Sequence, residues 1–181
     1  MRVITGKAKG RKLKTLEGND VRPTTDKVKE AVFSAIQFEL EGARVIDLFS
    51  GSGQMGIEAL SRGADYAVFT DISKRSLDVT RENIENTGFL QQSKLINTDG
   101  IGFLQTASEK FDIAILDPPY RHGLIEKALP HLHRVMNDGG IIICEHEKEL
   151  VLSDCEGFSV RKQYNYGKIS VTLLSAEKEG D

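Results

Sequence analysis

The sequence has little of what marks several protein classes. Only two of its 181 residues are cysteines, Cys144 and Cys155, too few to suggest a disulfide framework or a cysteine-rich zinc site. The four histidines show no metal-ligand spacing, so we predict no metal. No apolar run approaches the roughly 18 residues that cross a bilayer, and the N-terminus lacks the apolar core of a signal peptide. These absences favour a cytoplasmic protein with reduced thiols and no membrane contact.

Charge is distributed unevenly along the chain. The formal net charge is −3, yet the first 14 residues carry six lysines and arginines and no acid, so the remainder sums to −9. Two short apolar segments, 1–5 and 11–16, flank a glycine-bracketed turn and predict a β-hairpin. We therefore expect residues 1–22 to form a basic arm that contacts a polyanion, and residues 23–181 to form one globular domain, monomeric by default. The candidates for phosphate contacts are Arg2, Lys7, Lys9, Arg11 and Lys12.

The rest of the chain alternates between predicted strands and helices. Apolar runs predict strands at residues 44–48, 66–70, 94–96, 111–116 and 140–144, with helical segments between them at 55–62, 74–87, 100–106 and 123–136. Thr25 is placed to cap an earlier helix, and we expect Pro130 to kink or split the last one. This order predicts a doubly wound α/β fold with a mostly parallel sheet. Residues 165–167 (NYG) predict a C-terminal hairpin that adds two antiparallel strands.

Four aspartates follow the first four of these strands. Asp47, Asp71, Asp99 and Asp117 each fall at or just beyond the end of a predicted strand. The carboxyl ends of parallel strands share one edge of the sheet, where ligands bind in open α/β folds. We therefore expect these four carboxylates to face a common site.

The glycine-rich stretch after the first of these strands indicates a nucleoside cofactor. Gly51, Gly53 and Gly56 form a G-x-G-x-x-G pattern, which alone fits a nicotinamide dinucleotide. A carboxylate at the mouth of this loop, Asp47, repels a pyrophosphate and suits a cation. S-adenosylmethionine carries a sulfonium and an ammonium and no phosphate, so the residues favour it. We expect Asp71 to bind the ribose hydroxyls and Asp99 the adenine amine. The full predicted cofactor set is Asp47, Phe49, Gly51, Ser52, Gly53, Asp71, Ile72, Asp99 and Gly100.

Asp117 begins the motif Asp-Pro-Pro-Tyr, directly behind the predicted strand 111–116. Prolines have no N–H to donate to a sheet, so the strand ends here and the turn is stiff. A carboxylate and an aromatic ring are thus held close together, an arrangement that suits a planar, amine-bearing ring. Asp117 can accept from the amine while Tyr120 stacks on the ring. The predicted catalytic residues are Asp117, Pro118, Pro119 and Tyr120.

These motifs resemble those of known families. Residues 47–53 (DLFSGSG) resemble the first motif of class I S-adenosylmethionine-dependent methyltransferases, which have a Rossmann-like seven-stranded sheet. The motif at 117–120 resembles that of enzymes methylating exocyclic amines of adenine or guanine. Residues 10–13 (GRKL), 22–30 (RPTTDKVKE) and 56–64 (GIEALSRGA) are similar to the bacterial 16S ribosomal RNA guanine-N2 methyltransferases of the guanine-966 type. The similarity extends from Met1 to about Glu147.

The resemblance implies a substrate and a reaction. It implies methyl transfer from S-adenosylmethionine, with S-adenosylhomocysteine as product, to a guanine in 16S ribosomal RNA within an assembling small subunit. The chain departs from the pattern of this family at Asp71, where glutamate is common. Arg22 and Thr24 are further substrate-binding candidates, and they either contact RNA or close over the cofactor.

Three other functions remain open. An adenine-N6 DNA methyltransferase shares the Asp-Pro-Pro-Tyr motif, but only about forty residues here lie outside the core, which leaves little room for sequence readout. A catalytically silent RNA-binding or assembly factor would not need acids at four strand ends. A small-molecule methyltransferase would leave the basic hairpin without a purpose.

Overall fold

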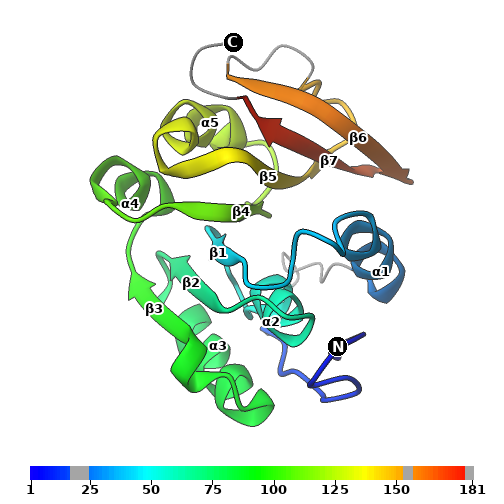
Figure 1. Cartoon of the computed structure of the whole chain (residues 1–181), viewed down its shortest axis with the longest axis vertical. Coiled ribbons are helices and arrows are strands. Elements are labelled where there is room, and N and C mark those ends of the chain that lie inside the picture. The colour runs from blue at the N-terminus through cyan, green and yellow to red at the C-terminus, as the bar shows by residue number, and fades with distance from the viewer. Residues whose placement is uncertain (17–24, 153–156, 178–181) are drawn as a thin grey trace.

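The protein forms one mixed seven-stranded sheet in the order β3-β2-β1-β4-β5-β7-β6 (Figure 1). The computed structural model describes residues 1–16, 25–152 and 157–177. The parallel strands are β1 (Arg44–Asp47), β2 (Tyr66–Asp71), β3 (Ser93–Asn97), β4 (Phe111–Leu116) and β5 (Met136–Glu147). The C-terminal β6 (Phe158–Tyr166) and β7 (Ile169–Ala176) are antiparallel, and β7 pairs with both β5 and β6.

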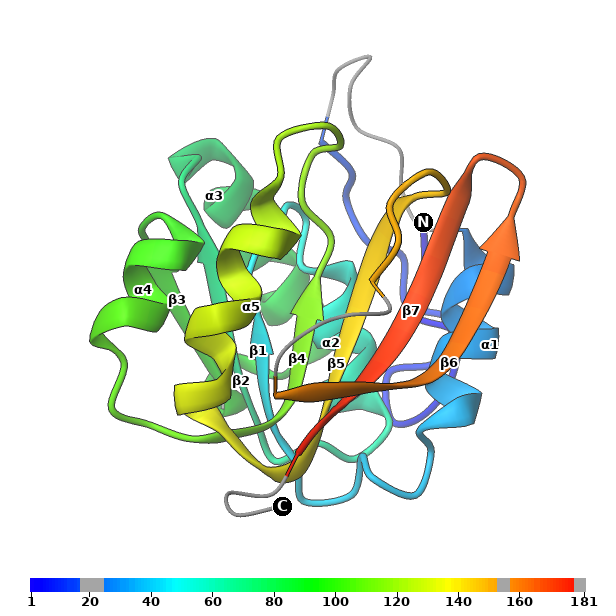
Figure 2. The ribbon, with the colours of Figure 1, turned by 90° about the horizontal axis from the view of Figure 1, so that it is seen from above.

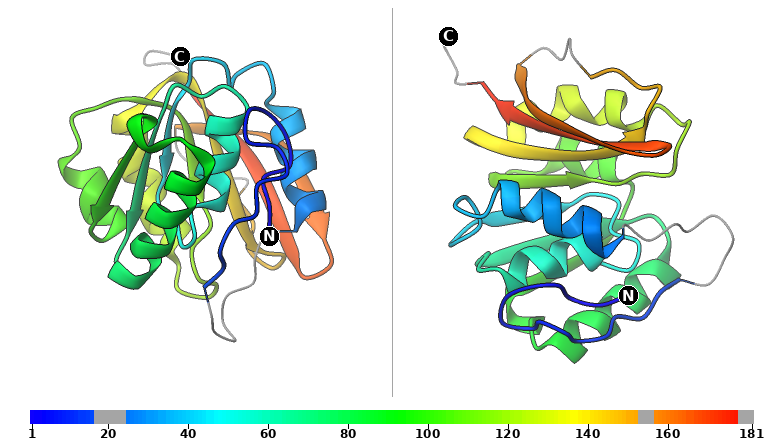
Figure 3. Two further views of the ribbon diagram at one scale, coloured as in Figure 1. Left: turned by 90° about the horizontal axis from the view of Figure 1, so that it is seen from below. Right: turned by 90° about the vertical axis from the view of Figure 1, so that its right-hand side faces the viewer.

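Helices cover both faces of the sheet (Figures 2 and 3). On one face lie α1 (Asp26–Ala35), α2 (Gln54–Ser61) and α3 (Lys74–Thr87); on the other lie α4 (Gly100–Thr106) and α5 (Leu124–Val135). Successive strand residues point to opposite faces, so Val45 packs in the cluster under α1 and α2, while Ile46 packs in the cluster under α4 and α5. The expected doubly wound α/β fold with a C-terminal antiparallel hairpin is therefore confirmed.

Some element bounds differ from those expected. β5 begins at Met136 and not near residue 140 as expected. Residues 137–139 (NDG) have the composition of a turn and are exposed, yet they belong to the strand. α5 runs unbroken through Pro130, so the expected split of this helix is wrong. A short 3-10 helix, η1 (Leu90–Gln92), precedes β3 and was not foreseen. The expected cap of α1 is confirmed, since the Thr25 hydroxyl accepts from the Val28 amide at 3.4 Å.

The N-terminal segment packs along α2. Its pairing is limited to a bridge between Arg2 and Lys12, flanked by backbone bonds such as Val3 N–H to Arg11 O at 3.0 Å. One side of this segment is buried: Val3, Ala8 and Leu13 are each at most 5% exposed. The predicted boundary at residues 22 and 23 lies outside the described residues.

Buried polar groups of the helices hold this segment in place. Glu58 of α2 is fully buried and accepts from the amides of Ile4 (2.8 Å) and Thr5 (3.0 Å) and from Arg62 Nε (2.7 Å). Lys29 of α1 is equally buried, and its Nζ donates to the Arg2 carbonyl at 2.7 Å. Burial lowers the pKa of Lys29, and the charges of Glu58 and Asp26 oppose that shift. Residues 1–5 are therefore held against α1 and α2 by buried side chains.

Candidate active site

The glycine-rich loop between β1 and α2 is shaped by tight contacts. Gly53 precedes α2 with φ +76°, and a Cβ there would come within 2.7 Å of Thr80 Cγ2. A Cβ on Gly56 would lie 2.4 Å from the Phe69 ring and 3.1 Å from Asp47 Oδ2. Glycine at these positions lets α2 start directly behind β1, with its first turn close to the Asp47 carboxylate.

Asp71 at the end of β2 fixes this loop. Its Oδ2 accepts from the Gly51 amide at 2.9 Å, and its Oδ1 accepts from the Ser73 amide at 2.8 Å. Partial burial raises the pKa of Asp71, although these two hydrogen bonds oppose the rise. Asp71 thus holds the loop in place, and it borders the cavity beside it.

Asp47 is the most perturbed carboxyl of the site. It is 1% exposed, and its Oδ2 accepts from the Gly56 amide at 3.0 Å. Burial raises its pKa to about 7, the Gly56 hydrogen bond lowers it, and the nearby Asp71 raises it further. A buried carboxyl poised near neutrality favours a cationic ligand, because a positive charge next to it restores the ionised form.

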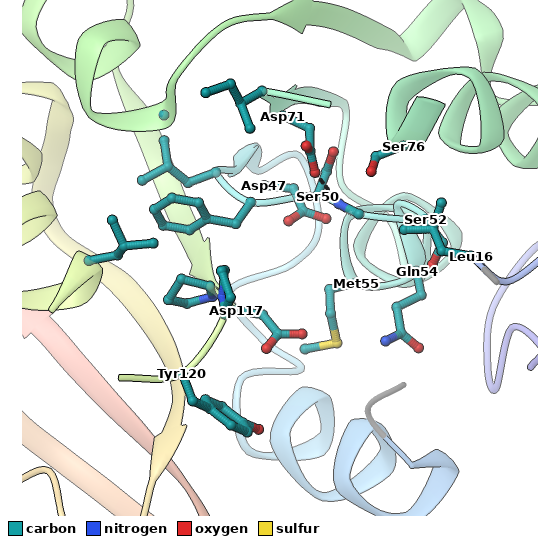
Figure 4. Close-up of a pocket in the computed structure, with 18 of the residues that line it drawn as sticks. Leu16, Asp47, Ser50, Ser52, Gln54, Met55, Asp71, Ser76, Asp117 and Tyr120 are labelled. Atoms are coloured by element: carbon teal, nitrogen blue, oxygen red, sulfur yellow. Dashed lines mark hydrogen bonds between the residues drawn. The ribbon is translucent and has the colours of Figure 1, made fainter. Parts of the chain in front are cut away.

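A cavity of about 870 Å³ opens at the carboxyl edge of the sheet and brings all four strand-end aspartates together. Figure 4 shows Asp47, Asp71, Asp117 and Tyr120 arranged around one space, with Gln54 and Met55 of α2 also bordering it. Asp99 caps α4 through a 2.9 Å bond from the Gly102 amide to its Oδ2, and lines the cavity next to Gly100. A Cβ on Gly100 would lie 2.8 Å from the Leu48 carbonyl oxygen.

Most predicted site residues meet in this cavity. Its walls include the whole catalytic set, Asp117 to Tyr120, and every predicted cofactor residue except Gly53. Gly53 instead supports the loop from behind, against Thr80. Ile72 lies at the rim of the cavity and is 78% exposed, which is unusual for an isoleucine. A flat apolar ligand in the cavity would cover this side chain. Among the described residues, no group of histidine, cysteine, aspartate and glutamate side chains is arranged to hold a metal ion.

The basic residues lie apart from the cavity. Within the described part of the chain, no lysine or arginine lines it. Arg2 pairs with Asp26 at 3.0 Å. The turn that carries Lys7 and Lys9 sits at the C-terminal end of α2, where the Lys7 amide donates to the Ser61 carbonyl at 2.7 Å. The cavity is at the other end of this helix, about 12 Å away at 1.5 Å per residue.

The remaining predicted substrate residues are placed differently. Arg11 and Lys12 lie on the return limb of the N-terminal segment, and both are exposed. That limb leads back to Thr15 and Leu16 at the cavity. Arg22 and Thr24 are outside the described residues.

Sequence reasoning missed several wall residues. Met1, Thr15 and Leu16 reach the cavity because the N-terminal segment runs along α2, which no local pattern reveals. Ser50 and Gln54 flank the glycines and are 6% and 7% exposed. Ser50 Oγ and Gln54 Oε1 are buried without a hydrogen-bond partner among the described residues. Buried polar atoms normally have partners, so these atoms fit a cavity that receives a ligand rich in hydrogen-bond donors, such as the amino-acid end of S-adenosylmethionine.

Comparisons with known proteins agree with this geometry. The family model described as Conserved hypothetical protein 95 matches residues 1–175. The chain is 35% identical over 179 residues to "Putative rRNA methyltransferase YlbH" of Bacillus subtilis, covering 96% of this chain and 97% of that protein. It is 32% identical to "Ribosomal RNA small subunit methyltransferase D" of Haemophilus influenzae, with 96% and 92% covered.

Solved structures that resemble this fold are also named methyltransferases or methylases. "Putative methyltransferase yhhF" from Escherichia coli superposes with a TM-score of 0.87 at 29% identity, covering 99% of both chains. A "putative methylase" from Haemophilus influenzae gives 0.83 at 28% identity, with 98% of both chains covered. The chain therefore belongs to the Conserved hypothetical protein 95 family, which is the family of the ribosomal RNA small subunit methyltransferases D.

Proposed function

We propose that this protein transfers a methyl group from S-adenosylmethionine to the exocyclic N2 amine of a guanine in 16S ribosomal RNA. The observation that carries the proposal is the cavity at the carboxyl edge of the sheet. There, one wall suits a cationic nucleoside cofactor, and the Asp-Pro-Pro-Tyr loop forms another. The names of the relatives support ribosomal RNA as the substrate.

The cofactor wall divides into three parts. Asp47, the glycine-rich loop and the unpartnered oxygens of Ser50 and Gln54 suit the amino-acid end. Asp71 suits the ribose hydroxyls, since a carboxylate oxygen with one backbone donor can accept a second bond. Asp99 and the exposed Ile72 suit the adenine, one by accepting from its amine and the other by covering its face.

The Asp-Pro-Pro-Tyr loop suits the target base. An aromatic exocyclic amine is a poor nucleophile because its lone pair is delocalised into the ring. Asp117 and the Pro118 carbonyl accept its two N–H groups and so favour a nitrogen whose lone pair is free to react. Tyr120 stacks on the base, a contact worth roughly 1–3 kcal/mol. The bound cofactor supplies an electrophilic sulfonium methyl, and its transfer yields S-adenosylhomocysteine, the methylated amine and one proton. Holding the two reactants in register can supply about 7–11 kcal/mol.

The target base must leave its stack to reach this loop. Loop nucleotides of ribosomal RNA are the natural targets for such a pocket. Lys7, Lys9, Arg11 and Lys12 are exposed on the N-terminal segment, outside the cavity, and they suit the phosphates of the RNA around the target base. Such an extended contact fits a folded RNA substrate better than a free nucleotide.

A transfer assay with labelled methyl groups tests the substrate class. The wild-type protein and Asp117→Ala are each given undermethylated small subunits, naked 16S ribosomal RNA and duplex DNA. We expect label in RNA or subunits with the wild type and a loss of at least 100-fold, about 2.7 kcal/mol, with the variant. Label in DNA alone would overturn the proposal in favour of an adenine methyltransferase, and absence of label from all three would indicate a binding factor.

A further inference from the structure

The residue that follows Cys144 on β5 lies beside the Asp-Pro-Pro-Tyr loop. β4 and β5 are paired in register, with Leu116 opposite Cys144, so Glu145 stands next to Asp117 at the carboxyl edge. Glu145 is 3% exposed and is held on its other side by pairing with Val171 of β7. Its Oε1 accepts from the Tyr120 hydroxyl at 3.1 Å. A carboxylate from the middle of the sheet thus contacts the ring that is proposed to stack on the target base.

A second glutamate of β5 holds the next residue of the loop. The amide of Arg121 donates to Glu147 Oε1 at 3.2 Å. Arg121 has φ +65°, the only positive φ of a non-glycine residue in the described part of the chain. A residue keeps such a conformation when its surroundings fix it, and such residues gather at functional sites. The loop is therefore fixed at its start by two prolines and at its end by β5.

We propose that Glu145 is a positioning residue, which fixes the plane of the Tyr120 ring for stacking on the target base. The prolines fix the backbone up to Pro119, but they do not fix the rotation of the Tyr120 side chain. The hydrogen bond from the Tyr120 hydroxyl to Glu145 Oε1 restricts this rotation. Strand pairing on both sides of β5 fixes the backbone of Glu145, and burial of the residue restricts its side chain.

This role explains why a carboxylate is buried at this point. Burying a polar group is costly unless it is hydrogen-bonded, and an apolar residue would fit the sheet edge more easily. The inference rests on the proposed stacking role of Tyr120, and it adds that the Tyr120 hydroxyl matters through Glu145 and not through the substrate.

Three variants test the pair. Tyr120→Phe keeps the ring and removes the donor; Glu145→Leu removes the acceptor; Glu145→Gln keeps an acceptor oxygen at the same place. We expect Tyr120→Phe and Glu145→Leu each to lower kcat about tenfold, which corresponds to the loss of one hydrogen bond. The affinity for S-adenosylmethionine should stay within about twofold. Glu145→Gln should retain most of the wild-type kcat. The double variant that combines Tyr120→Phe with Glu145→Leu should be no worse than either of these two single variants.

The outcomes separate this inference from the proposed function. If Tyr120→Ala leaves kcat unchanged, the stacking role fails and the positioning role fails with it. If Tyr120→Ala is impaired while Tyr120→Phe matches the wild type, only the positioning role is overturned. Additive losses in the double variant, or a Glu145→Gln variant as impaired as Glu145→Leu, would also overturn it.

Matched controls exclude a general loss of structure. Tyr164→Phe removes a hydroxyl on β6, away from the cavity walls, and Glu149→Leu changes an exposed glutamate beyond β5. Both should retain wild-type kcat. If Glu145→Leu does not fold, as judged by thermal unfolding and cofactor binding, the Tyr120→Phe and Glu145→Gln pair still decides the question, because neither changes the volume of the site appreciably.

Discussion

Asp47→Asn should stabilise the cofactor-free protein while weakening cofactor binding. Asp47 is buried, and its pKa rises from 3.8 to about 7. At a pH above 7, where the Asp47 carboxyl is ionised in the folded protein, this difference in pKa lowers the free energy of unfolding by about 4 kcal/mol. Asparagine keeps an oxygen for the Gly56 amide and has no charge to bury. We therefore expect the free energy of unfolding at pH 8 to increase, by up to about 4 kcal/mol.

The pH dependence gives this prediction its sign. Below about pH 4 the carboxyl is protonated in both folded and unfolded states, so its ionisation contributes nothing to the difference in stability between wild type and variant. Between about pH 4 and pH 7 the unfolded chain releases a proton that the folded protein still holds, so the wild type loses stability as pH rises. Above about pH 7 the full difference is present and should stay constant.

Urea unfolding of both proteins between pH 4 and pH 8.5 measures this difference directly. Calorimetric titration with S-adenosylmethionine at pH 8 should show weaker binding to the variant by at least tenfold. The exposed Asp78→Asn on α3 serves as control and should change stability by less than about 0.5 kcal/mol. A variant less stable than the wild type at pH 8, or a difference that does not grow with pH, would show that burial of the Asp47 charge does not destabilise the folded protein.

Other predictions concern the loop, the N-terminal segment and the RNA surface. Gly56→Ala forces a Cβ against the Phe69 ring and should cost about 1–3 kcal/mol by urea unfolding, whereas Gly102→Ala in α4 meets only an ordinary 3.5 Å contact and should be neutral or stabilising by up to about 1 kcal/mol. Equal effects would contradict the packing account. Glu58→Leu should cost roughly 3–5 kcal/mol by the same assay, because it leaves buried donors unpaired, and a cost below about 1 kcal/mol would contradict its anchoring role. Lys12→Ala should reduce the salt slope of RNA binding in a filter assay by about one, and an unchanged slope would remove Lys12 from the RNA surface.

The elements that the sequence predicted well carry local signals. α3 and β4 have the expected bounds: α3 begins after the Ser73 cap and ends at Gly88 with φ +84°, and β4 stops at two prolines. The gathering of the four aspartates also followed from sequence, because parallel strands must place their carboxyl ends on one edge.

The features that sequence could not reveal depend on tertiary packing. Leu16 reaches the cavity because the N-terminal segment lies along α2. The same segment covers Glu58, whose carboxylate accepts hydrogen bonds from it. The contact between Tyr120 and Glu145 depends on the register of β4 and β5, which no pattern in either strand specifies. The first half of β5 resembles a turn in sequence, and its pairing with β4 is irregular there: Met136 pairs with Phe111, and the register then shifts before Ile141 pairs with Ile113.

The identity of the methylated nucleoside distinguishes guanine-N2 from adenine-N6 methylation. Undermethylated small subunits are incubated with the protein and labelled S-adenosylmethionine, the RNA is digested, and the nucleosides are separated by mass spectrometry. We expect label in N2-methylguanosine from 16S ribosomal RNA, and none when Asp117→Ala replaces the wild type. Label in N6-methyladenosine, or in a base methylated on carbon, would contradict it.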